Sequence, residues 1–196
     1  MEFYRVYQFK ITLKDIKPPI WRRIQVPETY TFWDLHVAIQ DAMGWEDDHL
    51  HTFFIKHPLT QREFSLMVKP EDNYMLEDVW WDDFLDEREE KIADWFTLEN
   101  RVAEYVYDWG DEWRHRIRLE KILPRKEGVK YPICISGKGA CPPEDCGGPI
   151  GYLHLLAALD DPAHPMHEQA IEILGENFDP EYFDPKEVIF RDPEKV

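Results

Sequence analysis

The segment from Trp113 to Lys121 alternates apolar and charged side chains without interruption. The apolar set consists of Trp113, His115, Ile117 and Leu119. The other set consists of Arg114, Arg116, Arg118 and Glu120. A repeat of two is typical of a β-strand that buries one face, whereas a helix repeats about every 3.6 residues. The chain is therefore expected to build a β-sheet that buries the apolar set and carries the arginine row on its opposite face.

Further strands are predicted on either side of this segment. Residues 5–13 and 20–26 also alternate, and the turn between them contains two prolines, so we expect them to pair as a hairpin. Residues 102–107 are expected to form a second hairpin with the arginine strand. A shorter strand is expected at 52–55.

One helix is predicted between the second strand and the strand at 52–55. Thr31 is a suitable N-cap, and Asp34 stands where a capping box has its carboxylate. Apolar residues then recur at helical spacing, and Gly44 is a suitable residue to end the helix. Two more helices are expected near the C-terminus, at about 151–159 and 165–174.

The order of these elements predicts an α+β fold with a mixed β-sheet, a β-grasp-like strand–strand–helix–strand start and C-terminal helices. With 196 residues, the chain is expected to form a single domain over 1–196. An acidic insertion is expected at about 71–94, where eleven acidic residues stand against two basic ones. This segment is either a solvated insertion whose aromatic residues dock on the core or a binding segment for a basic partner.

The charge of the chain limits its partners. Asp and Glu number 40 and Lys and Arg 23, so the net charge at pH 7 is −17. Duplex nucleic acid is bound through Lys and Arg that displace counterions, so we expect a protein or peptide partner and no duplex binding. The sequence shows no signal peptide, no membrane-length apolar run and an odd number of cysteines, three. We therefore expect a cytoplasmic protein with reduced thiols that does not enter a membrane.

Three motifs carry a family resemblance. Residues 105–115 read YVYDWGDEWRH, residues 140–152 read ACPPEDCGGPIGY, and residues 49–53 read HLHTF. Through these motifs the chain resembles the plasmid pRiA4b Orf-3-like family, whose members occur on plasmids, transposons and chromosomes. The resemblance extends from about residue 7 to residue 161. It implies an association with mobile elements and leaves the activity open.

The loop at 139–152 is expected to be rigid and functional, because its four glycines and three prolines restrict the backbone. Cys141 and Cys146 lie in this loop and Cys134 precedes it, so the three thiolates are candidate zinc ligands. Their spacing, C-x6-C-x4-C, meets only the loosest zinc-binding pattern. Reduced, partly buried thiols explain these residues without a ligand, and the sequence favours this interpretation. The sequence therefore requires no cofactor, and zinc or another divalent metal stays an open alternative.

A second candidate site consists of carboxylates and histidines from all three motifs. The catalytic candidates are Asp108, Asp111, His115, Glu144 and Asp145. Further candidate metal ligands are His49 and His51. Hard divalent ions prefer oxygen ligands, and histidine completes sites for manganese or iron. Turn formation and core packing are competing roles for the same residues, because Asp108 and Asp111 flank a glycine and His115 lies on the apolar face of its strand.

A binding surface is the third interpretation. Aromatic and arginine side chains are common in interface hot spots, and they gather around the hairpin and the loop. The candidates for binding are Tyr107, Trp109, Trp113, Arg114, Arg116 and Tyr152. The sequence thus favours a non-enzymatic interaction or regulatory module. The alternative is a metal-dependent hydrolase, with nucleic acid among its substrates, that uses the carboxylates and histidines.

Overall fold

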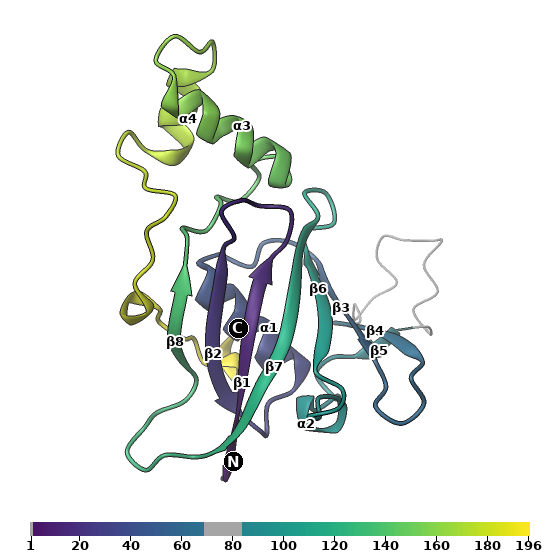
Figure 1. The fold of residues 1–196 in the computed structure, drawn as a ribbon. Coiled ribbons are helices and arrows are strands. Elements are labelled where there is room, and N and C mark those ends of the chain that lie inside the picture. The colour runs from purple at the N-terminus through teal and green to yellow at the C-terminus, as the bar shows by residue number, and fades with distance from the viewer. Residues whose placement is uncertain (1, 69–83) are drawn as a thin grey trace.

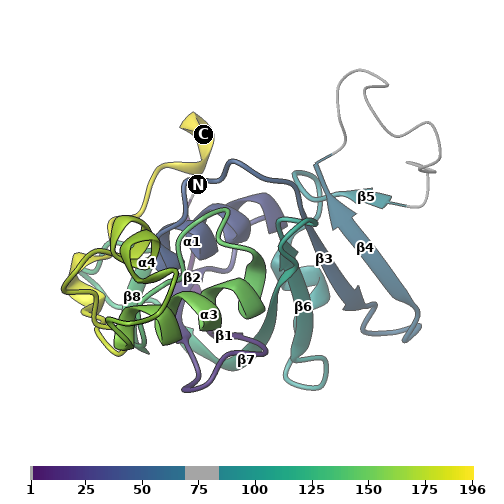
Figure 2. The same ribbon diagram turned by 90° about the horizontal axis from the view of Figure 1, so that it is seen from above.

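The computed structural model describes residues 2–68 and 84–196, which form one β-sheet with helices on one face and at one end (Figures 1 and 2). The strands of the described residues are β1 (Arg5–Leu13), β2 (Trp21–Pro27), β3 (His51–Lys56), β4 (Glu63–Met67), β5 (Phe84–Asp86), β6 (Val102–Tyr107), β7 (Trp113–Pro124) and β8 (Ile133–Lys138). The helices are α1 (Phe32–Met43), α2 (Ile92–Trp95), α3 (Gly148–Asp160) and α4 (His167–Leu174), followed by the short 3-10 helices η2 (Pro185–Glu187) and η3 (Pro193–Lys195).

The described strands lie in the order β5-β4-β3-β6-β7-β1-β2-β8. All neighbours are antiparallel except β4 and β5, which are parallel, so the predicted α+β class with a mixed sheet is confirmed. Both predicted hairpins are present, because β1 pairs with β2 and β6 with β7. The strand–strand–helix–strand order is also present. Since β3 lies between β4 and β6, away from β1, a β-grasp-like arrangement of this start stays a prediction.

The alternating side chains of β7 place apolar residues on one face of the sheet and arginines on the other, as predicted. The apolar set of this strand is fully buried, whereas Arg114, Arg116 and Arg118 are exposed. On the buried side, α1 packs against the sheet through Phe32, Leu35 and other side chains that exclude water completely. Burial of this kind contributes about 25 cal/mol per Å² of apolar surface, so the side of the sheet that faces α1 holds the core.

The predicted capping box of α1 is confirmed. The backbone N–H of Asp34 donates to Thr31 Oγ1 at 3.2 Å, and the backbone N–H of Thr31 donates to Asp34 Oδ2 at 2.8 Å. The helix ends at Gly44, whose φ of 101° lies in the left-handed region that glycine adopts without strain. Local sequence signals therefore determine both ends of this helix.

Part of the predicted acidic insertion at 71–94 lies outside the described residues, which resume at Phe84. From there the chain forms β5 and α2, and the Glu87 carboxylate between them is fully buried. None of the helices in the described ranges combines the length and the apolar composition that crossing a membrane requires.

Candidate functional site

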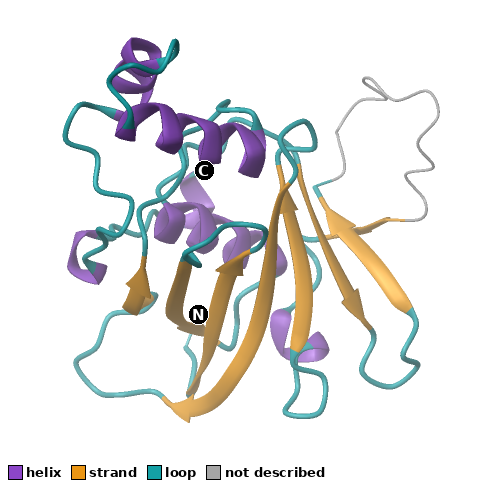
Figure 3. Cartoon of the chain, turned by 45° about the horizontal axis from the view of Figure 1, so that its top comes forward, coloured by secondary structure: helices purple, strands orange, loops and turns teal. Residues whose placement is uncertain are grey.

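Three chain segments meet at one end of the sheet, where β6 ends and β3 begins, close to α3 (Figures 1 and 3). The β6–β7 turn supplies Asp108, the loop before α3 supplies Glu144 and Asp145, and the segment before β3 supplies His49. Each segment belongs to a different one of the three sequence motifs. The structure therefore brings residues of all three motifs into one cluster.

His49 lies at the centre of this cluster. Its Nε2 atom is 3.1 Å from Asp145 Oδ1, 3.7 Å from Glu144 Oε2 and 3.8 Å from Asp108 Oδ2. Nε2 is shielded from solvent, and none of the described residues is placed to form a hydrogen bond with it. The Asp145 side chain is 77% exposed, whereas the other two carboxylates are mostly covered. One imidazole edge thus faces three carboxylates, one of which is open to solvent.

Hydrogen bonds orient the two covered carboxylates. Asp108 Oδ1 accepts from the backbone N–H of Gly110 at 2.8 Å, which is the turn role expected from the sequence. Glu144 Oε1 accepts from the backbone N–H of Glu46 at 3.0 Å and from the Tyr107 hydroxyl at 3.1 Å. Burial raises the pKa of Glu144, and these hydrogen bonds act in the opposite direction. Both carboxylates are therefore held in place before any ligand arrives.

Asp111 connects the hairpin to the loop. Its Oδ2 atom accepts from the backbone N–H of Gly147 at 3.0 Å. The next residue, Gly148, has a φ of +66°, and a Cβ there would lie 2.3 Å from the carbonyl oxygen of Asp111. Helix α3 begins at Gly148, earlier than the predicted start at about 151, and no side chain caps it. Neither Glu144 nor Asp145 therefore caps this helix.

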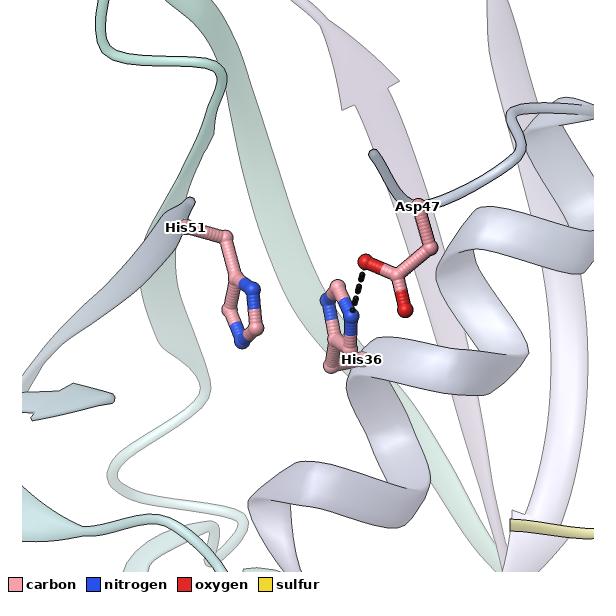
Figure 4. Close-up of side chains that lie close together, drawn as sticks. All are labelled: His36, Asp47 and His51. Carbon is pink, nitrogen blue, oxygen red and sulfur yellow. Dashed lines mark hydrogen bonds and ion pairs between the residues drawn. The ribbon is translucent and has the colours of Figure 1, made fainter. Parts of the chain in front are cut away.

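A second histidine cluster joins α1 to the start of β3 (Figure 4). The rings of His36 and His51 stack, with centroids 3.4 Å apart and planes inclined by 7°. His36 Nε2 is 2.8 Å from Asp47 Oδ1, and His51 Nε2 is 2.8 Å from Oε1 of the buried Glu87. The predicted metal candidate His51 is thus paired with a carboxylate from the acidic segment.

The hydrogen bonds of this cluster fix the protonation of His36. The Gln40 amide donates to the Tyr105 hydroxyl at 2.8 Å, so the Tyr105 O–H is free to donate to His36 Nδ1, also at 2.8 Å. The ring proton must then sit on Nε2 and be donated to Asp47. Burial lowers the pKa of His36 to about 4, and the nearby His51 acts in the same direction. At neutral pH this ring is therefore neutral, and both of its nitrogens are engaged.

His115 is buried in the core, as its position on β7 predicted, and backbone groups of Tyr105 and Trp113 lie near its ring without forming a well-aligned hydrogen bond. Both ring nitrogens lack a partner among the described residues, and the ring packs edge-on against Trp45 with centroids 5.3 Å apart. Burial lowers the pKa of His115 to about 3. His115 does not contribute to either of the two groups of potential metal ligands found in the described residues.

The three cysteines are free and partly buried. Neither group of potential metal ligands in the described part of the chain includes one of them: Cys134, Cys141 and Cys146. Burial raises the pKa of all three thiols, to about 12 for Cys146. The thiols are therefore protonated at neutral pH, which matches the interpretation of reduced, partly buried cysteines.

The six predicted binding residues fall into two sets. Three are buried in the core, and we assign them no surface role: Tyr107, Trp113 and Tyr152. The other three are Trp109, Arg114 and Arg116. This second set lines a hollow of about 1200 Å³ on the face of the sheet that carries the arginine row. The surface part of the predicted binding site is thus confined to this face.

Sequence reasoning missed three residues of the second histidine cluster. His36 had a usable signal, because it and Gln40 are polar residues one turn apart on the apolar face of α1. Asp47 and Glu87 lie outside regular elements and had no such signal. Their roles depend on contacts that only the folded chain creates.

Comparison with known proteins establishes the family. The profile of the family described as "Plasmid pRiA4b ORF-3-like protein" matches residues 5–187, so the chain belongs to this family, as the motifs predicted. "Uncharacterized protein y4hQ" of Sinorhizobium fredii (strain NBRC 101917 / NGR234) is 34% identical over 173 residues, which are 87% of this chain and 81% of that protein. A crystal structure of a protein of unknown function, MM3350 from Methanosarcina mazei Go1, is 50% identical, with a TM-score of 0.88, and covers 96% of this chain and 100% of its own.

Proposed function

We propose that this protein is a non-enzymatic interaction module that binds an acidic segment of a partner protein on the open face of its sheet. The hollow of about 1200 Å³ over β3, β6 and β7 carries the proposal. Within the described residues α1 covers one face of the sheet, and no helix covers the face with the hollow (Figures 1 and 2). A concave surface with apolar and polar groups is typical of a binding site. The cytoplasmic location expected from the sequence belongs to the same proposal.

The hollow combines an apolar floor with oriented polar groups. Phe54 and Val106 contribute apolar surface from neighbouring strands. Trp109 stands beside them, 38% exposed, and its indole N–H donates to Thr52 Oγ1 at 3.2 Å. An indole that is half open to solvent and fixed by a hydrogen bond loses little entropy when a partner covers it. Trp109 is therefore the expected anchor for an apolar side chain of the partner.

The charges on this face favour an acidic partner. The hollow and a smaller one beside it are together lined by eight Lys and Arg and five Glu side chains, Arg101 being common to both. This local excess is opposite in sign to the net charge of −17. Three ion pairs, Lys14–Glu104 at 2.9 Å, Arg114–Glu112 at 3.0 Å and Arg23–Glu120 at 2.6 Å, neutralise part of it.

Five of the lining cations, Lys56, Arg101, Arg116, Arg118 and Lys121, form no ion pair within the described residues, and Arg116 and Arg118 lie two residues apart on β7. Within the described ranges neither side chain forms an ion pair or a hydrogen bond, and both are exposed. Because they are two residues apart on one strand, their side chains leave the sheet about 7 Å apart. An extended peptide places alternate side chains at the same interval, so acidic residues at alternate positions would meet both arginines.

An extended polyanion such as single-stranded nucleic acid fits this face less well. Nucleic-acid binding draws its affinity from many cations that displace counterions. The described lining offers five cations without an ion pair, beside the unpaired Glu63 and Glu99, and the net charge of −17 repels a polyanion as a whole. A short acidic and aromatic protein segment is therefore the occupant that the face favours.

A metal-dependent hydrolase, the alternative function, is less well supported by the geometry. The lining of the large hollow includes none of the four residues of the His49 cluster. A hydrolase needs its ligands beside a substrate cleft. The cluster and the hollow are separate features, which favours the interaction module.

Peptide selection from a random display library tests the proposed function. We expect the selected peptides to be enriched in Asp, Glu and aromatic residues. The Arg116→Glu variant should bind a selected peptide at least about tenfold more weakly, because it reverses a charge at the centre of the face. Lys130→Glu makes the same charge change on an exposed residue of the β7–β8 loop and should alter the affinity by less than about twofold.

Equal effects of Arg116→Glu and Lys130→Glu, or selected peptides without an acidic excess, would contradict the proposal. A single-stranded oligonucleotide serves as the competing probe. If it binds more tightly than any selected peptide, with a steep salt dependence that Arg116→Glu reduces, nucleic acid replaces the acidic peptide as the occupant.

A further inference from the structure

We infer that the chain binds one divalent first-row transition metal ion through His49, Asp108, Glu144 and Asp145. This site goes beyond the proposed docking face and does not depend on it. The four side chains come from three segments that are far apart in the sequence, so a bound ion would join all three motifs. The inference concerns a binding site and requires no reaction.

The donor set determines the class of ion. One imidazole nitrogen and three carboxylate groups combine a borderline ligand with hard oxygen ligands. Such a set suits Mn²⁺, Fe²⁺ or Zn²⁺, whereas Ca²⁺ and Mg²⁺ favour sites made of oxygen alone. The absence of a thiolate from this cluster also separates it from the cysteine-rich structural zinc sites.

The separations of the donor atoms match those of a metal centre. Metal–nitrogen and metal–oxygen bonds are about 2.1 Å long, so neighbouring ligand atoms lie about 3.0 Å apart at a right angle and about 3.4 Å apart in a tetrahedron. The distances from His49 Nε2 to the carboxylate oxygens are 3.1, 3.7 and 3.8 Å. The donor atoms of His49, Asp108 and Asp145 all lie within 4.8 Å of one another, and Glu144 Oε2 adjoins this group at 3.7 Å from His49 Nε2. The carboxylates would therefore close around a bound ion.

The state of His49 Nε2 is an independent observation that points to a cation. This atom is shielded from solvent and has no hydrogen-bond partner among the described residues, although three carboxylates lie within 4 Å. The Nε2 edge of the ring is thus aimed at a space that is bounded by oxygens of three carboxylates. A divalent ion in this space uses the lone pair of Nε2 and neutralises two of the carboxylate charges.

Three of the four ring nitrogens in the second histidine cluster are already engaged. Both nitrogens of His36 are engaged, by Tyr105 and Asp47, and His51 Nε2 pairs with Glu87. An ion there would have to break a buried chain of hydrogen bonds. The His49 cluster is therefore the metal site and the His36 cluster is a structural network.

The site is pre-organised and accessible. Backbone and hydroxyl donors already orient Asp108 and Glu144. Asp145 lies at the surface with a φ of 53°, so an ion can enter from solvent on its side. A ligand set that needs little reorganisation binds with a smaller entropy cost.

Calorimetric titration of the chelator-treated chain with MnCl₂ and with ZnCl₂ tests the site. We expect one ion to bind per chain, and Asp145→Asn to weaken its binding at least about tenfold, because the variant removes one charged ligand. Asparagine suits a left-handed backbone, and circular dichroism verifies that the variant is folded. Asp48→Asn is the matched control. Asp48 is exposed and close enough to influence Glu144, but it does not face His49, so its replacement should weaken binding by less than about threefold.

Three results would overturn the inference. The first is uptake of less than one equivalent of either ion at about 100 μM metal, because the binding free energy would then be weaker than about −5 kcal/mol. The second is an equal effect of Asp145→Asn and Asp48→Asn, which would mean that ions only screen the acidic surface. The third is loss of binding in a folded His51→Gln variant, which would place the ion in the other histidine cluster.

Discussion

Replacing His115 with phenylalanine is expected to stabilise the protein, and to stabilise it more at acidic pH. His115 is fully buried, and its two ring nitrogens have no partner among the described residues. Leaving a buried polar group unsatisfied costs about 1–3 kcal/mol. Phenylalanine removes this cost and keeps the edge-on contact with Trp45, while its larger ring adds about 1 kcal/mol of strain. At neutral pH the net gain in the free energy of unfolding is thus about 0–2 kcal/mol.

The difference in unfolding free energy between the variant and the wild-type protein should also change with pH. This change is the better test, because the packing contributions are the same at every pH and drop out of it. Burial lowers the pKa of His115 from 6.5 to about 3. Between these values the unfolded wild-type chain binds a proton that the folded chain rejects, so the wild-type protein loses stability as the pH falls below 6.5. From about pH 7.5 to about pH 5.5 the loss is about 1 kcal/mol, and His115→Phe does not suffer it.

Urea unfolding of both proteins at the two pH values measures this difference. The free-energy advantage of the variant should grow by about 1 kcal/mol on going to the lower pH. His154→Phe removes an exposed histidine from α3 and should show no such growth. An advantage of His115→Phe that stays constant or shrinks at the lower pH would refute the conclusion that His115 is a neutral, unpaired core residue.

Two further variants probe the contacts that hold the site. Tyr105→Phe should cost about 2–5 kcal/mol, since it leaves His36 Nδ1 and an amide without partners; a loss below about 1 kcal/mol in urea unfolding would argue against the hydrogen-bonded chain. Gly148→Ala should cost more than about 2 kcal/mol, because its Cβ would meet the Asp111 carbonyl oxygen at 2.3 Å as well as straining a φ of +66°. Gly44 also has a positive φ, but open space surrounds it, so Gly44→Ala should lose only the cost of backbone strain, about 1 kcal/mol. Equal losses of stability for the two variants in thermal or urea unfolding would mean that the hairpin and the loop are not in tight contact.

Local signals in the sequence were sufficient for the individual elements. The alternation of β7 and the capping box of Thr31 and Asp34 depend on a few neighbouring residues, and both are present as predicted. The order of strands in the sheet could not be predicted in this way. It places β3 beside β6, and that pairing depends on the packing of segments about 50 residues apart rather than on either segment alone.

The sequence indicated which residues form the candidate site, but not how these residues are arranged. The motifs supplied His49, Asp108, Glu144 and Asp145, because acidic pairs and histidines stand out among glycines and prolines. They did not separate these four residues from His115, which turned out to be enclosed in the core. Burial and distance decide which titratable groups can meet, and both are properties of the folded sheet.

Tryptophan indole signals in a ¹H–¹⁵N correlation spectrum test the central claim, the docking of an acidic segment on the open face. The chain has eight tryptophans, and Trp109 lies on that face, whereas Trp33 lies on α1 with its indole N–H bonded to the carbonyl of Pro193. On addition of a selected acidic peptide, the Trp109 signal should shift in a saturable way and the Trp33 signal should stay in place. A saturable shift of Trp33 with an unchanged Trp109 would contradict the account.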